Sequence, residues 1–329
     1  MKILITGGTG FIGKQVADQL LRTGTVALEG DAPRPISKLV LFDPFPGEHV
    51  WTDPRVEVVA GDIADPQTVE RVAESVEIVW HLAAVVSSAA EADFDLGMQT
   101  NLSGLTNLLE TLRAIGTRPR VVNASSYAVF GGELPHTVTD ATALSPKTSY
   151  GTQKAIGELL VADYSRKGFI DGRNLRLPTI AIRPGKPNKA ASTFVSSIIR
   201  EPLRRLPAVC PARPDTLVFV SSPRSACEAM LRAMNLSDRS IGPERTIPLP
   251  GLTVSIAEMV AVLERVAGPE APQYIEWKPD PQIQRIIDSW PLRVDASRAR
   301  ALGFATDRNF EEIVRAHIED EAVPRWWRK

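Results

Sequence analysis

Residues 3–13 read ILITGGTGFIG, an apolar β-type run that passes through a glycine-rich turn into the first turn of a helical pattern. Glycines in this context let the backbone turn tightly and approach a pyrophosphate, while the helix N-terminus supplies free N–H groups and a favourable dipole. The stretch therefore predicts a strand–turn–helix unit that binds a dinucleotide. The residues expected to contact the dinucleotide here are Gly7, Gly10, Phe11, Ile12 and Gly13.

Short β-type runs alternate with helical patterns through the first half of the chain. The runs that follow the first strand (2–6) lie at 38–43, 56–62, 76–84, 120–126 and 177–184. Each is almost continuously apolar, as is typical of strands that are buried on both faces of a parallel sheet. Because strands separated by helices favour parallel pairing, the sequence predicts an α/β fold built on a doubly wound parallel Rossmann sheet.

The pattern changes after about residue 185, where prolines become frequent and the predicted elements become shorter and less regular. We expect residues 1–184 to form the dinucleotide-binding Rossmann domain. Residues 185–329 are expected to form mostly a smaller α/β region that binds the substrate. Within that region, residues 217–230 begin with the apolar run LVFVSS and are the segment that can rejoin the first domain.

The composition of the 329-residue chain narrows the possible partners. Its 38 basic and 39 acidic residues nearly cancel, which gives no indication of binding to nucleic acid or to an anionic membrane. No run of about 18 apolar residues occurs, so we expect no membrane span. Cys210 and Cys227 lack the spacing of a metal or redox motif and are expected to be reduced thiols of a cytoplasmic protein without a metal site. A disulfide between them is the less favoured alternative.

Acidic residues follow the second and third predicted strands. Asp43 ends the second strand, where a carboxylate accepts hydrogen bonds from the adenosine ribose and repels a 2′-phosphate. This position favours NAD over NADP, although Arg34 and Lys38 in the preceding insert leave some use of NADP open. Asp62 and Ile63 follow the third strand and are candidates for the adenine, one for its amino group and the other for its ring.

Tyr150 and Lys154 are four residues apart on a predicted helix, so both side chains point to the same side. A tyrosine is a poor base at its ordinary pKa of about 10, but a nearby ammonium and an oxidised nicotinamide stabilise the phenolate. Such a pair can remove a proton from an alcohol while hydride leaves. Ser125 and Ser126 end the fifth strand, at the sheet edge where α/β proteins hold ligands, and either hydroxyl can bind the substrate oxygen.

Together these motifs resemble the extended short-chain dehydrogenase/reductase superfamily, which includes the NAD-dependent epimerases and dehydratases. The stretches that carry the resemblance are TGGTGFIG (6–13), NASS (123–126), FG (130–131), YGTQK (150–154) and the C-terminal VDASRARALGF (294–304). They extend it over nearly the whole chain. The resemblance implies that Ser126, rather than Ser125, acts with Tyr150 and Lys154, because FG follows Ser126 at the family's distance. Phe130 departs from the family pattern, which has tyrosine at that position.

The resemblance also implies supporting residues around the cofactor, which it identifies as NAD. Asn101 matches the helix asparagine that has a supporting or relay role in the family's catalysis. HLAA (81–84) matches the loop beside the cofactor, and Pro184 matches the turn beside the nicotinamide. From that loop, the expected cofactor contacts are Leu82, Ala83 and Ala84.

Two features distinguish among the reactions of this superfamily. Dehydratases usually carry an acidic pair directly after the serine, whereas YAVF follows Ser126, so dehydration is not expected. Nucleotide-sugar enzymes often carry an Arg-Asp pair before the strand that matches 217–222. Here Asp215 and Thr216 stand at those positions, and a carboxylate in place of the arginine would repel a diphosphate. A nucleotide-sugar 4-epimerase is kept as the alternative enzyme. A non-enzymatic NAD-sensing protein is less favoured, because such proteins usually lack the tyrosine or the lysine.

The stretch GKPNKAASTFVSSIIREPL (185–203) resembles the D-erythronate dehydrogenase group of this superfamily. That resemblance implies an NAD-dependent dehydrogenase that oxidises the C2 hydroxyl of a small sugar acid, D-erythronate, to 2-oxo-tetronate. A four-carbon acid needs a compact pocket that is cationic or rich in N–H groups, and the start of a helix near residue 192 can contribute to it. The expected substrate contacts are Ser126 and Tyr150 with Ser87, Asn188, Lys189 and Ser192, and Arg285 and residues 288–291 are further candidates.

Two predicted helices are apolar on more than one face, namely the one that carries Tyr150 and the one over residues 101–116. Helices of this kind are buried on two sides. One side packs on the sheet and the other is available to a second subunit, so a homodimer is expected.

Overall fold

The computed structural model describes residues 1–47, 51–185 and 192–327, and its centre is a seven-stranded sheet in the order β12-β8-β7-β6-β1-β4-β5. All of its strand pairs are parallel. Its strands are β1 (Lys2–Thr6), β4 (Lys38–Asp43), β5 (Val56–Ala60), β6 (Ile78–His81), β7 (Arg120–Ser126), β8 (Asp171–Leu177) and β12 (Thr246–Pro248). From β1 the chain runs outward to β4 and β5 on one side and later to β6, β7 and β8 on the other. The predicted doubly wound parallel Rossmann sheet is confirmed.

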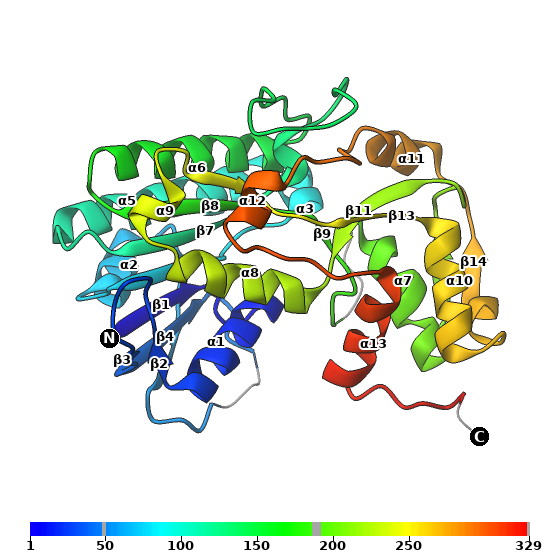
Figure 1. Cartoon of the computed structure of the whole chain (residues 1–329), viewed down its shortest axis with the longest axis horizontal. Helices are drawn as coiled ribbons and strands as arrows, with labels where there is room; N and C mark the ends of the chain where they lie inside the picture. The colour runs from blue at the N-terminus through cyan, green and yellow to red at the C-terminus, as the bar shows by residue number, and fades with distance from the viewer. Residues whose placement is uncertain (48–50, 186–191, 328–329) are drawn as a thin grey trace.

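Helices cover both faces of this sheet (Figure 1). The main ones are α1 (Phe11–Thr23), α2 (Pro66–Ala73), α5 (Gly104–Ile115), α6 (Ser149–Arg166) and α8 (Pro223–Asn235). On one face α1 and α8 pack against each other, and on the other α2, α5 and α6 lie side by side. The sheet is therefore buried on both sides, which is why its strands read as nearly continuous apolar runs.

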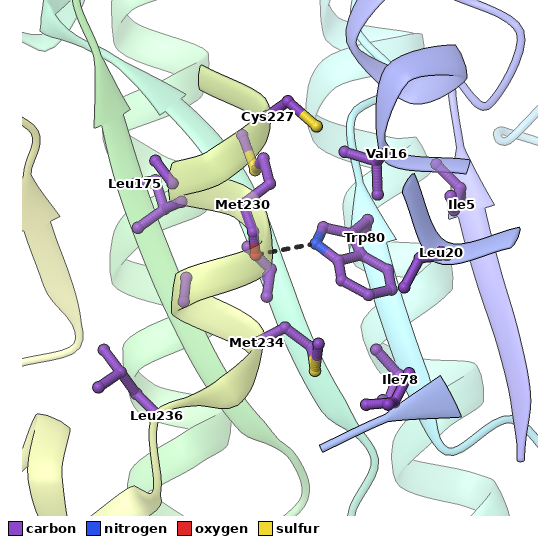
Figure 2. Packing of buried hydrophobic residues seen from close by; sticks show 14 of the residues in the cluster. Ile5, Val16, Leu20, Ile78, Trp80, Leu175, Cys227, Met230, Met234 and Leu236 are labelled. Carbon is purple, nitrogen blue, oxygen red and sulfur yellow. Dashed lines mark hydrogen bonds between the residues drawn. The ribbon is translucent and has the colours of Figure 1, made fainter. Parts of the chain in front are cut away.

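Trp80 of β6 is the largest fully buried side chain and joins the sheet to α8. Its indole Nε1 donates a hydrogen bond to the backbone oxygen of Met230, 3.2 Å away (Figure 2). Val16 and Leu20 of α1 lie near the same ring and belong to the same buried cluster (Figure 2). A segment that follows residue 185 in the sequence thus packs into the core of the first sheet.

A second region follows residue 178 and contains two smaller sheets, one in the order β13-β11-β9 and one formed by β10 and β14. Its strands are β9 (Thr179–Ile180), β10 (Ala208–Cys210), β11 (Leu217–Ser221), β13 (Leu252–Ser255) and β14 (Ile275–Trp277). Its helices are α7 (Thr193–Arg200), α10 (Ile256–Ala267), α11 (Pro281–Asp288) and α13 (Phe310–Asp320). These elements share a separate apolar core, and they lie beside the carboxyl end of the main sheet, with the C-terminus at the far side from the N-terminus (Figure 1).

The remaining elements are short connections. They are β2 (Thr25–Val26), β3 (Arg34–Pro35), α3 (Ser87–Ala92), α4 (Phe94–Gly97), α9 (Asp238–Ile241), α12 (Ser297–Ala301), the π-helix Met98–Ser103 and 3-10 turns at Tyr127–Val129, Pro202–Arg204 and Ala271–Tyr274.

The prediction of the sixth strand at 177–184 is wrong. The sixth strand of the sheet is β8, whose sequence DGRNLRL ends at Leu177, the first residue of that range. Of the other predicted residues only Thr179–Ile180 is a strand, and it pairs with β11 in another sheet. Strand β8 is not apolar in sequence, because its polar side chains are buried together with polar partners. Arg176 binds Glu158 of α6 at 2.7 Å, and Asn174 donates to Thr246 of β12 at 3.1 Å. Paired charges of this kind can be buried where an unpaired charge could not.

Across the part of the chain that the structure describes, no helix has the length and apolarity needed to cross a membrane. Cys210 and Cys227 are both buried and free, as expected for reduced thiols. Burial raises the pKa of the Cys227 thiol to about 12.

Candidate active site

A cavity of about 770 Å³ lies at the carboxyl ends of β1, β6 and β7. One end is formed by the glycine-rich turn after β1, and the other by residues that follow β8 and by α11. The predicted site residues that line it are Gly7, Gly10, Phe11, Ile12, Gly13, Leu82, Ala84, Ser87, Ser126, Tyr150, Lys154 and Ser192. The fold thus brings together stretches that are far apart in the sequence.

The glycine-rich turn is packed so closely that a side chain would not fit at Gly7, Gly8 or Gly13. A Cβ on Gly7, which has a φ of +66°, would lie 2.8 Å from the backbone nitrogen of Ala83, and a Cβ on Gly13 would lie 2.5 Å from the oxygen of Gly7. Helix α1 starts directly after Gly10, and no side chain caps its N-terminus. Its free N–H groups and dipole are therefore available to an anion, so these residues fit the pyrophosphate of a dinucleotide.

Buried polar contacts fix the loop at 82–84 against this turn. The hydroxyl Oγ1 of Thr6 lies 2.9 Å from Nδ1 of His81 and accepts a hydrogen bond from the backbone nitrogen of Ala83 at 3.3 Å. Burial, together with the nearby ammonium of Lys154, lowers the pKa of His81 to about 3, so the imidazole is neutral. Ala83 itself packs against Gly7 rather than lining the cavity.

The residues predicted for the adenosine lie outside the cavity wall. Asp43 ends β4 beside the turn, and its carboxylate accepts a hydrogen bond from the backbone nitrogen of Phe45 at 3.1 Å. Asp62 is exposed and accepts from the backbone nitrogen of Ala64 at 2.9 Å. Ile63 is buried in the apolar core between the sheet and the α2–α5 layer, close to Gly104. Their roles toward a nucleotide stay predictions.

Arg34 and Lys38, the two cations that could have bound the 2′-phosphate of NADP, each form an ion pair with a glutamate of this chain. Arg34 pairs with Glu77 at 2.6 Å, and Lys38 pairs with Glu57 at 2.5 Å. Lys38 is the first residue of β4 and Asp43 the last, so the two are separated along the strand by roughly 16 Å. Both cations therefore lie toward the edge of the sheet opposite the glycine-rich turn, which favours NAD.

Tyr150 and Lys154 lie one turn apart on α6, which Thr148 caps by accepting a hydrogen bond from the backbone nitrogen of Gly151 at 3.1 Å. The Nζ of Lys154 is 5.7 Å from the centre of the Tyr150 ring and donates to the backbone oxygen of Ala124 at 2.8 Å. Burial raises the pKa of Tyr150 to about 12, against the opposite effects of a hydrogen bond with Ser126 and of Arg183. Burial lowers the pKa of Lys154 to about 8, partly offset by Glu158.

The two serines of β7 have different partners. Ser125 is buried, and its hydroxyl donates to the carboxylate of Glu158 at 2.5 Å. Ser126 accepts from the backbone nitrogen of Ala128 at 3.1 Å, and its hydroxyl lies close enough to Tyr150 to lower the pKa of the phenol. Because Ser125 is engaged by Glu158, Ser126 is the serine left beside the tyrosine, and its catalytic role stays a prediction.

Asn101 is buried in the π-helix 98–103 and does not line the cavity. Its Oδ1 accepts from the backbone nitrogen of Val85 at 2.8 Å, and its Nδ2 donates to the oxygen of Val85 at 3.0 Å and to Gln153 at 2.7 Å. Asn101 therefore ties the loop after β6 to the residue that precedes Lys154. Local π-helical turns are frequent at functional sites.

The substrate side of the cavity differs most from what we expected. Asn188 and Lys189 lie outside the described residues, and Pro184 and Arg285 do not line the cavity. Two groups that the sequence reasoning did not single out do line it: Arg183, and Gln282, Ile283 and Ile286 of α11, next to the expected Trp290 and Pro291. In the sequence, Arg183 could have been found as a charged residue at the end of an apolar run. No sequence feature indicates that α11 lines the cavity, because its position depends on contacts between distant parts of the chain.

Helix α11 is held in place by contacts with residues 213–216, the segment that contains Asp215 and Thr216. Gln284 of α11 donates to Thr216 at 3.0 Å and accepts from the backbone nitrogen of Arg213 at 3.0 Å. Asp215 is exposed and pairs with Arg213 at 3.2 Å. Neither Asp215 nor Thr216 lines the cavity, so this segment acts on the site by holding α11 in place.

Comparisons with known proteins agree with this geometry. Residues 3–213 match the model of the NAD dependent epimerase/dehydratase family. The chain is 49% identical to the D-erythronate dehydrogenase of Cupriavidus necator, over 99% of this chain and 100% of that protein. It is 43% identical to the D-erythronate dehydrogenase of Haemophilus influenzae, over 97% and 99%. A crystal structure described as the nucleoside-diphosphate-sugar epimerase from Agrobacterium tumefaciens has a TM-score of 0.92 and 41% identity, over 98% of this chain and 94% of that one.

Proposed function

The chain belongs to the NAD dependent epimerase/dehydratase family, and on that premise we propose that it is an NAD-dependent dehydrogenase of small sugar acids. The proposed reaction is oxidation of the C2 hydroxyl of D-erythronate to 2-oxo-tetronate, a step of carbohydrate metabolism. The observation that carries the proposal is the grouping of Ser126, Tyr150 and Lys154 at the cavity wall. The names of the two relatives at 49% and 43% identity support the choice of substrate.

The catalytic roles proposed for this grouping follow from its contacts. Ser126 and Tyr150 bind the C2 hydroxyl, and the Tyr150 phenolate takes its proton. Lys154 stabilises the phenolate, since its ammonium lies 5.7 Å from the ring centre. Asn101 has a supporting role through Gln153 and the loop after β6. NAD, when bound, supplies the hydride acceptor.

The residues proposed to hold NAD run from the glycine-rich turn to α6. The turn and the N-terminus of α1 take the pyrophosphate, Asp43 the adenosine ribose, and Asp62 with Ile63 the adenine. Leu82, Ala83, Ala84 and Pro184 are proposed to lie beside the nicotinamide end, together with Tyr150 and Lys154. In this proposal residues 1–184 provide the NAD domain, and residues 185–329 provide most of the substrate contacts, with Ser87 added from the first domain. Of the segment 217–230, the α8 part packs on the main sheet, whereas β11 pairs within the second region.

A nucleotide-sugar 4-epimerase is the alternative on this fold, and the name of the Agrobacterium tumefaciens structure favours it. Two relatives whose names specify an acid substrate, both matched over nearly their full length, weigh more heavily for the dehydrogenase. The two activities differ in how they use the cofactor. An epimerase retains NAD through the cycle, whereas a dehydrogenase releases NADH at every turnover.

We further propose that the protein acts as a homodimer in the cytoplasm. Leu159 of α6 is 65% exposed and Phe94 of α4 is 58% exposed, and the two helices pack against each other. Exposed apolar side chains on two helices that pack together can contribute to one contiguous apolar patch, and such patches mark interaction sites. The two free, buried thiols support a reducing compartment.

A screen for NADH formation tests the proposed activity. Purified protein with NAD is offered C4–C6 sugar acids one at a time, with UDP-sugars as controls, and absorbance at the NADH band is followed. We expect steady NADH release with D-erythronate and none with UDP-sugars. Epimerisation of a UDP-sugar without NADH release would replace the dehydrogenase assignment by the alternative.

A further inference from the structure

Arg183 lies at the substrate end of the cavity, where the sequence pattern pointed instead to Lys189. Its backbone is held on both sides by α7, since its nitrogen donates to Ser196 at 3.1 Å and its oxygen accepts from Arg200 at 2.6 Å. Its guanidinium Nη2 reaches Ser192 at 3.3 Å, and both side chains line the cavity. The position of Arg183 is therefore set by its main chain, and its charged end is left to the cavity.

The guanidinium of Arg183 lacks an acidic partner among the described residues, although it is partly buried. The neighbouring cation Arg200 is neutralised by Glu201 at 2.7 Å. Burial and the charge of Arg200 lower the pKa of Arg183, which marks a cation in an unfavourable setting. A desolvated arginine without an acid is stabilised by a bound anion, and its planar fork suits a carboxylate held by two hydrogen bonds.

The other charged groups on the cavity wall cannot take this role. Lys154 is committed to the backbone of Ala124 and to Tyr150, and Glu91 is an anion that accepts from the backbone nitrogen of Ser149 at 2.9 Å. Among the described lining residues, Arg183 is the cation that remains.

We propose that Arg183, with Ser192 beside it, binds the carboxylate of the substrate and thereby selects 2-hydroxy acids. The inference rests on the proposed function and adds the residue that binds the substrate carboxylate. Arg183 is close enough to Tyr150 for its charge to act on the phenol. In a 2-hydroxy acid the carboxylate is bonded directly to the carbon that carries the reacting hydroxyl. A carboxylate held by Arg183 therefore places the adjacent C2 hydroxyl nearer to Tyr150 than the C3 and C4 hydroxyls, which are separated from the carboxylate by further carbons.

The test compares a charged and a neutral substrate in wild type and in Arg183→Gln. Wild type is expected to prefer D-erythronate to its amide, D-erythronamide. In Arg183→Gln we expect kcat/KM for D-erythronate to fall about 10- to 100-fold, the effect of losing a hydrogen-bonded charge, and kcat/KM for the amide to stay within about threefold. The loss should appear mainly as a raised KM for the acid, with KM for NAD unchanged. Arg183→Lys keeps the charge and should recover part of the preference.

Control variants and the wild-type result separate this inference from its premise. Arg166→Gln removes an exposed arginine that pairs with Asp163 at the end of α6 and should change neither substrate preference nor NAD binding. The inference is overturned if Arg183→Gln keeps the preference for the acid, if it lowers both substrates equally, or if Lys189→Ala abolishes the preference instead. Wild type that oxidises no sugar acid would remove the proposed function itself. Melting temperature and NAD affinity confirm that each variant is folded.

Discussion

At Tyr150 and Lys154, burial by itself works against the charged forms that the proposed proton transfer needs. Burial disfavours the charged form of each, so it raises the pKa of Tyr150 to about 12 and lowers that of Lys154 to about 8. At neutral pH the lysine still carries its proton, and its Nζ lies 5.7 Å from the centre of the tyrosine ring. Ser126 and Arg183 oppose the effect of burial on the pKa of the phenol. The proposed base therefore depends on its neighbours rather than on exposure to solvent.

Tyr150→Phe should remove the proposed base with little change in shape. We expect kcat for D-erythronate to fall by about 10²- to 10⁴-fold, the usual contribution of a positioned general base, while NAD binding is kept. Steady-state NADH formation and NAD titration measure the two effects. The matched control is Tyr164→Phe on the same helix, whose hydroxyl contacts Glu110 away from the cavity. A Tyr150→Phe enzyme with near wild-type kcat would contradict the assignment.

His81 links the site to pH-dependent stability. Its pKa is about 3 in the folded chain against 6.5 as the ordinary value, so between these limits the unfolded chain binds a proton that the folded chain does not. The free energy of unfolding therefore falls as the pH drops below 6.5, by up to about 1.4 kcal/mol per pH unit. His317 adds to the fall, since its pKa is lowered to about 4, mainly by burial.

Urea unfolding at several pH values between 7 and 4 measures this slope. His81→Gln should reduce the slope by the share of one histidine, whereas His136→Gln, which changes an exposed residue, should leave it unchanged. Equal slopes in wild type and His81→Gln would show that His81 takes up a proton without unfolding.

Among the elements, the strand–turn–helix unit at 2–23 depends most directly on its sequence. The turn in this unit needs glycine at position 13, because a side chain there would collide with the backbone oxygen of Gly7. Strand β8 could not be found from its own sequence in this way. An apolar run predicts a buried strand, but β8 is buried with polar side chains that bind Glu158 and Thr246. Backbone sterics act between neighbours in the chain, whereas the partners of β8 come from α6 and β12.

Gly13→Ala tests the steric requirement of the glycine-rich turn. A Cβ placed 2.5 Å from a backbone oxygen forces the turn to shift, so we expect the Kd for NAD to rise at least about tenfold and the free energy of unfolding to fall by about 1–3 kcal/mol. Calorimetric NAD titration and urea unfolding provide the two values. In the control Gly157→Ala, the new Cβ meets only the end of the Leu105 side chain, and NAD affinity should be unchanged. Unaltered NAD binding in Gly13→Ala would argue against a pyrophosphate at this turn.

At the scale of the whole molecule, the cavity is assembled from both regions of the chain. The glycine-rich turn, β7 and α6 form one side, and Arg183, Ser192 and α11 form the other. Residues from 7 to 291 therefore have to be folded together before the site exists. The exposed apolar positions on α4 and α6 lie on the first region, so the proposed dimer would join the parts that carry the NAD site.

Leu159→Glu tests the proposed dimer. Wild type is expected to sediment as a dimer at micromolar concentration, and a charge at this exposed apolar position should shift it toward the monomer because burying an unpaired carboxylate is costly. Leu206→Glu changes a leucine that is 51% exposed on the second region and should leave the mass unchanged. A monomeric wild type at that concentration would refute the homodimer.

The sequence by itself determined the doubly wound sheet, the glycine-rich turn and the placement of Ser126, Tyr150 and Lys154 at one edge. These depend on periodicity, on glycine sterics and on strand direction, which are local properties of the chain. Only the tertiary structure decided that Glu158 engages Ser125, that Arg34 and Lys38 are paired elsewhere, and that Arg183 and α11 complete the cavity. Those outcomes depend on which buried charges find partners from distant elements, and the energy of a charge is set by its surroundings rather than by its neighbours in sequence.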